Sequence, residues 1–232
     1  PLDSDRQPDL SYIDATCKVI GENLDSSALI INESPSYPGT IRNYIKPSIE
    51  KYSKVLVSHE YAISPERVDP GRVDWNQKNT PRLIGAIDTE SRQRALAFYE
   101  SICDAAVAVS TPEVAEAAKL FENTFRQVNI ALVNELAQIS HALGIDVRET
   151  LDAANTKPYG FMRFNPSAGV GGHCIPVDPS YLADVAEKAG VEATFIKRAN
   201  EVNLDMPKYI AGRMEKDNGG SLKDKKVLVV GV

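Results

Sequence analysis

The sequence predicts an α/β fold in which a parallel sheet is followed by a mainly helical part. Through roughly the first 110 residues, short apolar runs alternate with longer segments of helical periodicity, which is the pattern of consecutive βαβ units. A helical pattern of roughly 30 residues then begins at Thr111. The chain ends in an apolar run, 226–232, which is typical of a buried strand that opens a further α/β domain.

The elements of the sheet part follow from local patterns. Apolar runs bounded by turn residues predict strands at 27–32, 54–58, 82–87 and 104–109, and helical periodicity predicts helices at 8–24, 41–52 and 88–102. Ligands bind such sheets beyond the carboxyl ends of the strands, so Ser34 and the loop from His59 onward are placed to contact a cofactor. Turn chemistry alone is an equally good account of Ser34.

A charged pair follows in the same part of the chain. Glu66 and Arg67 stand between Pro65 and Pro70 at the exit of a predicted strand, which favours a fixed loop geometry. A solvated pair on a loop is an equally good reading.

The longest predicted helix has clear ends. Thr111 is a typical N-cap, Pro112 suits the first helical position, and Gly144 is the stop signal after His141 or Leu143. Apolar residues occupy nearly every side of this helix, so we expect neighbouring elements or a second subunit to bury it.

Polar residues on this helix stand out against the apolar background. Lys119, Asn123 and Arg126 are spaced i, i+4 and i+7, which places them on one face. A buried charge without a partner is costly, so we expect these side chains to meet anionic or polar groups. The alternative is a solvated stripe, to which Glu116 and Gln127 would also belong.

The remainder of the chain is predicted to be mostly helical. A short helix at 145–154 precedes a loop, 155–165, that is rich in aromatic and basic residues, among them Arg163. Helices are predicted from Asp178 to Ala189 and from Ala193 to about Lys216, followed by a linker at 218–220.

A glycine-rich segment, 169–179, is the most unusual stretch. Its glycines and prolines argue against a helix or a strand, so we expect Cys174 on a tight loop where the backbone crowds the thiol. Most free cysteines are core residues, and Cys17 and Cys103 fit that description because each lies in an apolar helical pattern. Cys174 does not fit it, and Asp178 stands four residues downstream as a polar partner.

Composition limits the classes of function. The 232 residues are 43% hydrophobic and 25% charged, with a net charge of −6, which argues against nucleic acid or an anionic membrane as partner. Three widely spaced cysteines, no membrane-length apolar run and no signal peptide predict a soluble protein of the cytoplasm. Because the chain opens at Pro1 and closes in a predicted strand, we expect it to be a segment of a longer protein.

Together these residues predict nucleophilic chemistry. A thiolate needs a nearby cation, and Lys119 could lower the pKa of Cys174 and hold a developing oxyanion, with Asp178 as general base. Next to a parallel sheet, this set suggests acyl chemistry coupled to a dinucleotide. Three alternatives stay open: a cysteine hydrolase, a poorly supported zinc site, and a non-catalytic dimerisation module built on the long helix. The histidines available to a hydrolase are His59, His141 and His173.

At these residues the chain resembles the UDP-glucose/GDP-mannose dehydrogenase family, the nucleotide-sugar 6-dehydrogenases. The resemblance rests on Gly171–Asp178, on Ala118–Asn123 and on Ser64–Arg67, and it covers nearly the whole chain. It implies the second half of a Rossmann-type NAD-binding domain at 1–110, a central helical dimerisation and catalytic domain at 111–217, and a linker with the start of a UDP-binding domain at 218–232.

The resemblance also implies the reaction, oxidation of a UDP-sugar C6 alcohol to a carboxylate with two NAD⁺. Cys174 would form a thiohemiacetal and then a thioester, Lys119 and Asn123 would stabilise the oxygen, and Asp178 and Glu66 would handle water and protons. Ser34 and Glu66 are the expected cofactor residues, and the expected substrate residues are Arg67, Lys119, Asn123, Arg126, Arg163 and Gly171.

The resemblance further implies the partners. Arg67, Arg126 and the segment 66–71 look more like the branch that acts on UDP-N-acetylglucosamine or UDP-N-acetylmannosamine. UDP-glucose 6-dehydrogenase and a truncated dimerisation fragment are the alternatives. A homodimer through the long helix is expected, without metal, nucleic acid or membrane.

Two departures from the family pattern bear on the cofactor. The glycine-rich phosphate fingerprint is missing because the chain starts after it, so this segment alone should bind NAD weakly or not at all. Pro35 stands where many relatives have a threonine, which removes a hydroxyl from the Glu33-Ser34 strand end.

Overall fold

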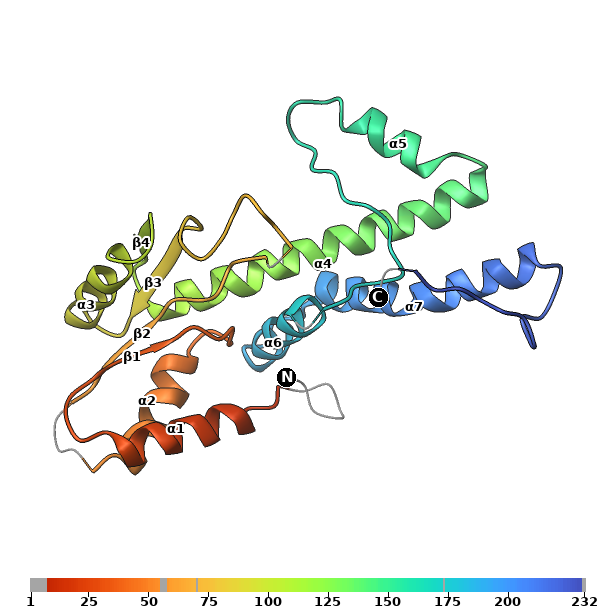
Figure 1. Cartoon of the computed structure of the whole chain (residues 1–232). Coiled ribbons are helices and arrows are strands. Elements are labelled where there is room, and N and C mark those ends of the chain that lie inside the picture. The colour runs from red at the N-terminus through yellow and green to blue at the C-terminus, as the bar shows by residue number, and fades with distance from the viewer. Residues whose placement is uncertain (1–7, 55–57, 70, 173, 231–232) are drawn as a thin grey trace. The chain divides into compact units, whose positions relative to one another are not determined.

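The computed structural model describes residues 8–54, 58–69, 71–172 and 174–230 (Figure 1). Contacts divide the chain into two compact units. Unit 1 comprises Pro1–Phe125 and His173–Ala193, and unit 2 comprises Arg126–Gly172 and Thr194–Val232. The units are a division by contacts in space, and the domain boundaries at 110 and 217 stay a prediction.

Unit 1 is built on a four-stranded sheet with the order β1-β2-β3-β4. The strands are β1 Leu29–Asn32, β2 Glu60–Ile63, β3 Arg82–Ala86 and β4 Ala106–Ala108. β1 and β2 are parallel, as are β3 and β4, but β3 runs antiparallel to β2, with Ile63 opposite Gly85. The expectation of a parallel sheet is therefore correct for two of the three pairings.

The second strand of the sheet differs from the expected one. Of the strand expected at 54–58, residues 55–57 lie outside the described residues. The loop expected from His59 onward is wrong, because Glu60–Ile63 forms β2. Tyr61, Ala62 and Ile63 are fully buried, so the strand is a central one despite its polar start.

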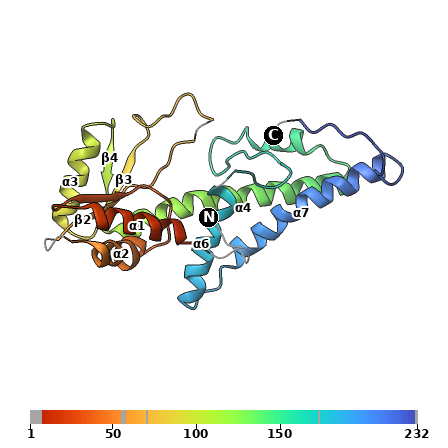
Figure 2. The ribbon, with the colours of Figure 1, turned by 60° about the horizontal axis from the view of Figure 1, so that its bottom comes forward.

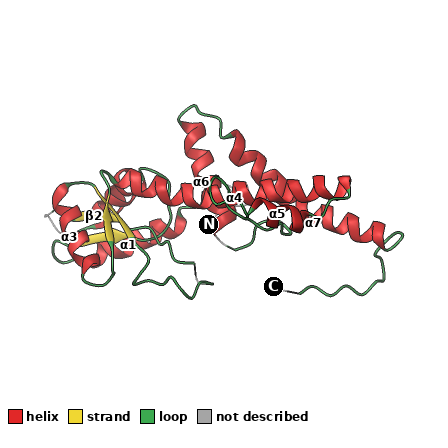
Figure 3. Ribbon diagram, turned by 90° about the horizontal axis from the view of Figure 1, so that it is seen from above, coloured by secondary structure: helices red, strands yellow, loops and turns green. Residues whose placement is uncertain are grey.

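Helices cover both faces of this sheet (Figure 3). In chain order they are α1 Ser11–Asn23, the π-helix η1 Ile41–Ile45, α2 Lys46–Tyr52 and α3 Thr89–Glu100. α1, η1 and α2 pack with Tyr61 and Ile63, whereas α3 packs with Ala62 and Ile84 from the opposite face, as the alternation of side chains along a strand requires. Asp88 caps α3 by accepting a hydrogen bond from the Ser91 amide.

The long helix has the expected bounds, but it is not fully covered. α4 extends over Pro112–Leu143, and Gly144 follows with φ of 68°. Phe121, Leu132 and Leu143 are each more than 60% exposed. Neighbouring elements of the described chain therefore leave this side of α4 uncovered, and its burial by a second subunit stays a prediction.

The segment around Cys174 also differs from the expectation. α6 comprises Cys174–Lys188, so Cys174 opens a helix instead of lying in a tight loop, and Asp178 lies one turn inside it. Pro176 is tolerated because the first turn of a helix has no partner for its N–H groups. Pro179 lies within the helix.

Unit 2 is helical. The second half of α4 packs alongside α7, Thr194–Asp217, through Val128, Ala131, Ala199 and Val202 (Figure 2). α5, Val147–Ala154, is capped by Asp146. Among the described residues, no helix is long and apolar enough to span a membrane.

The strand expected at 226–232 does not form in the described residues 226–230. These residues have no regular structure, and Leu228 and Val230 are exposed. A strand needs a partner for its backbone groups, and none of the described residues pairs with this segment.

The contact of α1 with α2 predicts a clear response to mutation. A Cβ on buried Gly21 would lie 2.6 Å from the carbonyl oxygen of Ile49, whereas one on Gly212 in α7 would meet no atom within 4 Å. We expect Gly21→Ala to lower the free energy of unfolding by about 1–3 kcal/mol through overpacking. Gly212→Ala should raise it by about 0.5–1 kcal/mol through helix propensity. Thermal unfolding followed by circular dichroism checks both, and equal melting temperatures for the two variants would contradict the packing described.

Candidate functional site

Buried polar side chains mark one face of α4. Glu116, Lys119 and Asn123 are at most 9% exposed, and Gln127 and Asn134 farther along the helix are fully buried. The solvated-stripe alternative is thus wrong for Glu116 and Gln127. Arg126, which was expected to share this face, is exposed.

Two of the predicted catalytic residues are in direct contact. The Asn123 side-chain amide donates a hydrogen bond of 2.6 Å to the Asp178 carboxylate, and both side chains are buried. This contact joins α4 to α6 within unit 1. The side chain of Cys174, one turn before Asp178, lies outside the described part of the structure, so the expected meeting of its thiol with Lys119 stays a prediction.

Lys119 is a cation held in a buried position. It is 8% exposed, and none of the other described residues forms a hydrogen bond or an ion pair with its ammonium. Because desolvating an unpaired ammonium is costly, this position suits an anion or a developing oxyanion brought by a ligand.

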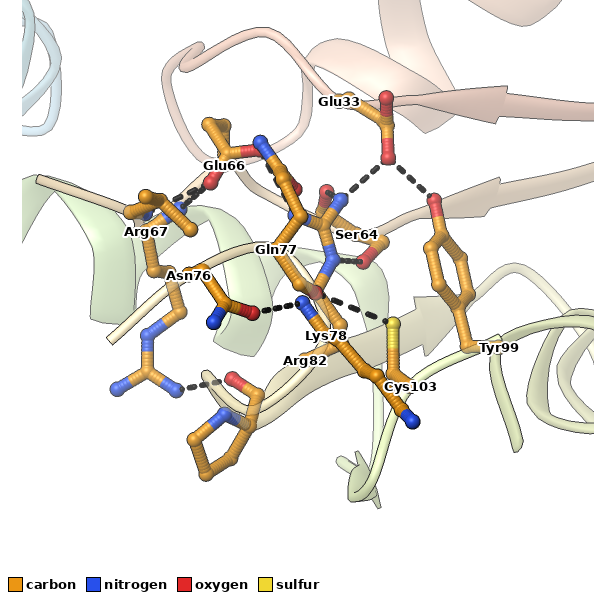
Figure 4. A network of polar contacts seen from close by, with 12 residues as sticks. Glu33, Ser64, Glu66, Arg67, Asn76, Gln77, Lys78, Arg82, Tyr99 and Cys103 are labelled. Carbon is orange, nitrogen blue, oxygen red and sulfur yellow. Dashed lines mark hydrogen bonds and ion pairs between the residues drawn. The ribbon is translucent and has the colours of Figure 1, made fainter. Parts of the chain in front are cut away.

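Glu66 lies just beyond β2, and its carboxylate is saturated with hydrogen bonds (Figure 4). One oxygen accepts from the amides of Arg67 and Val68 at 2.7 Å each, and the other accepts from Gln77 and Arg82 at 2.9 Å each. Burial alone would raise the pKa of Glu66, but the hydrogen bonds from Val68, Gln77 and Arg82 outweigh it and hold that pKa below its ordinary value. Glu66 is therefore an ionised carboxylate in a fixed orientation.

Arg67, an expected substrate residue, is engaged with its own chain. Its guanidinium forms an ion pair of 2.7 Å with Glu122 on α4 and donates to the carbonyl oxygen of Pro81 at 2.9 Å. These contacts tie the loop after β2 to α4, one residue before Asn123. These contacts use Nε and one N–H of each terminal nitrogen, which leaves two of the five N–H groups for a substrate contact.

Glu116 ties a second loop to α4. Its two oxygens accept hydrogen bonds from the amides of Gly39 at 2.6 Å and Ile41 at 2.9 Å, at the start of η1. Burial raises the pKa of Glu116 to about 7, although the hydrogen bonds from Ile41 and Gly39 oppose this. One turn earlier in α4, Glu113 forms an ion pair of 2.8 Å with Arg42 of η1. Glu116 was expected only as a member of a solvated stripe. Its position three residues before Lys119 is the feature of the sequence that could have indicated a buried role.

Ser34 lies where a cofactor residue was expected. It is exposed directly beyond β1, and its backbone amide donates to the side chain of Asn32 at 3.2 Å. Ser34 and Asn32 also line one end of a mostly apolar cavity of about 190 Å³, whose other walls include Cys17 and Ile30. Burial raises the pKa of the Cys17 thiol, which agrees with its reading as a core residue.

The other expected substrate residues, Arg126, Arg163 and Gly171, belong to unit 2. Arg163 forms an ion pair of 2.7 Å with Asp152 on α5. Gly171 is exposed.

The glycine segment itself is anchored within unit 2. The Asn134 side chain accepts from the Ser167 amide at 2.8 Å and donates to Asn203 at 3.0 Å. Gly169 has φ of 105°, and a Cβ there would lie 2.5 Å from the carbonyl oxygen of Asn203. Glycine is therefore required at 169 for both conformation and space.

The geometry of the described residues does not favour the cysteine hydrolase or the zinc site. The buried His59 ring lies 3.1 Å from the Ser53 hydroxyl, His141 belongs to unit 2, and His173 lies outside the described residues. In the part of the chain that the structure describes, no three histidine, cysteine or acidic side chains are grouped as metal ligands.

Comparison with known proteins finds one family. Residues 1–103 match the NAD-binding domain of the UDP-glucose/GDP-mannose dehydrogenase family, and residues 113–205 match its central domain. A UDP-N-acetyl-D-glucosamine 6-dehydrogenase of Pseudomonas aeruginosa is 36% identical over 219 residues, which is 93% of this chain and 51% of that protein. A UDP-N-acetyl-D-mannosamine dehydrogenase of Methanocaldococcus jannaschii is 36% identical over 92% of this chain and 48% of that protein.

Solved structures give the same result. A UDP-D-ManNAc dehydrogenase of Pyrococcus horikoshii superposes with a TM-score of 0.84 at 36% identity, over 94% of this chain and 52% of that one. A UDP-glucose dehydrogenase of Pyrobaculum islandicum, 24% identical over 95% of this chain and 52% of that one, shares the fold with a TM-score of 0.83. The chain spans about half the length of the relatives it matches.

The buried carboxyl group of Glu116 predicts a pH-dependent stability. Its folded pKa of about 7 lies above the ordinary 4.5. Its contribution is therefore complete below about pH 4.5 and is lost as the pH rises through about 7, a change of about 3 kcal/mol for this shift. Glu116→Gln should remove that slope between pH 5 and 8, even though the amide lowers stability at every pH by facing a backbone N–H. Denaturant unfolding followed by the fluorescence of Trp75, the single tryptophan, checks this.

Glu113→Gln is the matched control. Burial would raise the pKa of Glu113, but the hydrogen bond from Arg42 and further bonds hold it below its ordinary value. Its contribution is therefore lost only as the pH falls through the acid range. Parallel stability curves for the wild type and Glu116→Gln from pH 5 to 8 would contradict the titration of Glu116.

Proposed function

Since the chain belongs to the UDP-glucose/GDP-mannose dehydrogenase family, we propose that the complete protein containing it oxidises the C6 alcohol of a UDP-N-acetylhexosamine to a carboxylate with NAD. The named relatives, dehydrogenases of UDP-N-acetylglucosamine and UDP-N-acetylmannosamine at 36% identity, support this substrate class. The match of residues 1–103 to an NAD-binding domain supports the cofactor.

The observation that carries the proposal is the buried hydrogen bond between Asn123 and Asp178. It brings the helix with the Lys119 ammonium against the helix that opens at Cys174. The arrangement supplies a cation, an amide donor and a carboxylate within unit 1, close in sequence to a cysteine. An aldehyde oxidation by way of a thioester needs these groups.

The proposed roles follow from the chemistry of each side chain. The Cys174 thiolate adds to the carbon of the C6 aldehyde, a C–S bond forms, and the carbonyl electron pair becomes an oxyanion. Lys119 and Asn123 stabilise that oxyanion with their N–H groups. NAD⁺, when bound, accepts the hydride that leaves C6 in each of the two oxidations.

Hydrolysis of the thioester completes the proposed reaction. Water adds to the thioester carbon, the C–S bond breaks, and the sugar carboxylate and the thiol are released. Asp178 accepts a proton from that water, since its carboxylate is oriented by Asn123. Glu66 is ionised and fixed by four hydrogen bonds, so its proposed contact with a water or the cofactor would share an oxygen with one of these donors.

The proposed cofactor and substrate contacts involve further residues. Ser34 is exposed at the carboxyl end of β1, where ligands of open α/β sheets bind, and this supports its place at NAD. Arg67 of unit 1, and separately Arg126, Arg163 and Gly171 of unit 2, are each proposed as substrate residues. No metal is proposed for the reaction.

The exposed apolar side of α4 supports a homodimer. Phe121, Leu132, Ile139 and Leu143 are large and solvent-accessible in the isolated chain. A contiguous apolar helix face of this kind marks an interaction surface, and a second copy of α4 presents a matching one.

The proposed nucleophile is tested by Cys174→Ala in the complete protein. We expect loss of NADH formation from UDP-N-acetylhexosamines, with an unchanged circular dichroism spectrum, because no covalent intermediate can form. NADH absorbance and mass spectrometry of the sugar product measure this across a panel of UDP-sugars. Oxidation of a UDP-sugar to the uronic acid at the wild-type rate by Cys174→Ala would refute the role.

The proposed oxyanion contact is tested by Lys119→Ala. We expect kcat to fall on the order of 10²–10³-fold, the usual loss for one oxyanion donor. Lys188→Ala is the matched control, since Lys188 is an exposed lysine on α6 paired with Asp184. Equal rates for Lys119→Ala and Lys188→Ala would remove Lys119 from the reaction.

A further inference from the structure

Arg82, the first residue of β3, is a buried cation with all of its donors in use. The Arg82 residue is 1% exposed to solvent. Its Nε donates to the Ser64 hydroxyl at 3.1 Å, one terminal nitrogen donates to Glu66 at 2.9 Å and Gln77 at 3.5 Å, and the other donates to the Ser64 carbonyl at 3.2 Å and to Glu33. The five N–H groups of the guanidinium therefore have five acceptors (Figure 4).

Tyr99 on α3 fixes the guanidinium from one side. The Arg82 guanidinium carbon lies 5.0 Å from the centre of the Tyr99 ring, and the Tyr99 hydroxyl donates to Glu33 at 2.7 Å. A planar guanidinium can stack on a ring and bind two carboxylates at once, which a lysine ammonium cannot reproduce.

The direction of β3 places this cation at the ligand-binding edge of the sheet. β1 and β2 are parallel neighbours with Asn32 opposite Ile63, so their carboxyl ends lie together. β3 is antiparallel to β2, so its amino-terminal residue, Arg82, lies at the same edge. Glu33 follows β1 and Glu66 follows β2 directly at that edge.

We propose that Arg82 is a positioning residue that sets the spacing of the two loops after β1 and β2 and thereby the orientation of the Glu66 carboxylate toward a bound ligand. One guanidinium holds both loops through Glu33, Ser64 and Glu66. The structural part of this proposal is independent of the reaction, and its kinetic part rests on the proposed function.

Electrostatics favours this role over that of an ordinary surface ion pair. Glu33 and Glu66 are partly exposed, while the guanidinium between them is desolvated. Without Arg82, the Glu33 and Glu66 carboxylates would lose the counter-charge that they share. Glu66 would then lose one of its four side-chain hydrogen bonds, the one that links it to β3.

Arg82→Lys in the complete protein is the test, with Arg94→Lys as the matched control. Arg94 is half-exposed, lies in unit 1 and pairs with one carboxylate, Glu60. We expect Arg82→Lys to speed hydrogen exchange at the Arg67 and Val68 amides about tenfold or more, because local opening becomes easier. Arg94→Lys should leave this exchange unchanged. Ser64→Ala, which removes the acceptor of Nε and leaves the Glu33 and Glu66 contacts in place, should give the same pattern at smaller amplitude. It serves as the test if Arg82→Lys does not fold.

A double-mutant comparison and the pH profile of kcat/KM distinguish a positioning role of Arg82 from simple stabilisation of the fold. In a Glu66→Gln background, Arg82→Lys should add little to the exchange at Arg67 and Val68, because it acts through Glu66. In the otherwise wild-type protein, Arg82→Lys should move the acid limb of the kcat/KM profile to higher pH, while Arg94→Lys leaves the profile in place.

The exchange results either support or overturn the positioning role of Arg82. Unchanged exchange at residues 64–68 in both Arg82→Lys and Ser64→Ala, or equal effects of Arg82→Lys with and without Glu66→Gln, would overturn the proposal. A protein inactive toward every UDP-sugar would contradict the proposed function, whereas accelerated exchange coupled to Glu66 would still support the Arg82 contact.

Discussion

Unit 1 depends on one constraint: polar side chains buried along a largely apolar helix have to be paired. Along α4, Glu116 holds the amides before η1, Asn123 holds Asp178 of α6, and Glu122, next to Asn123, holds Arg67 of the loop after β2. Each pairing reaches a segment far away in the sequence. The cost of an unpaired buried polar group thus fixes the segments held by Glu116 and Asn123, and the partly exposed pair of Glu122 with Arg67 adds a third segment on the same two turns of helix. Lys119 lies among them as the buried cation for which no described residue supplies a partner.

A second polar centre organises the edge of the sheet. The antiparallel direction of β3 brings Arg82 to the carboxyl ends of β1 and β2, where a mixed sheet can accept a charge between two loops. Arg67 connects this centre to α4, because its backbone amide donates to Glu66 and its side chain pairs with Glu122. The strand-end loops and the polar face of α4 are therefore one hydrogen-bonded system within unit 1.

Local chemistry made part of this predictable. Pro112 and Gly144 mark the ends of α4 because first-turn proline and a left-handed glycine act within a few residues of the boundary. Asn123 and Asp178 are in contact, and their service in one catalytic site stays a prediction. The helix start at Cys174 was missed because glycine and proline were read as loop signals, although a first-turn proline costs a helix nothing.

Other features had no local signal. β2 begins with Glu60, directly after His59, and its burial is decided by strands on both sides. The partners of Arg82 lie 16 and 49 residues away in Glu66 and Glu33, so no window of the sequence could show them. The direction of β3 likewise depends on its pairing with β2, and an apolar run looks the same in either direction.

The proposed reaction requires that the Cys174 thiol and the Lys119 ammonium share one site. The pH dependence of iodoacetamide alkylation of Cys174, read from its own peptide by mass spectrometry, measures this directly. If the ammonium stabilises the thiolate, the alkylation midpoint of Cys174 will lie at higher pH in Lys119→Met than in the wild type, with the midpoint of Cys103 unchanged. The same midpoint for Cys174 in both proteins would contradict a shared site.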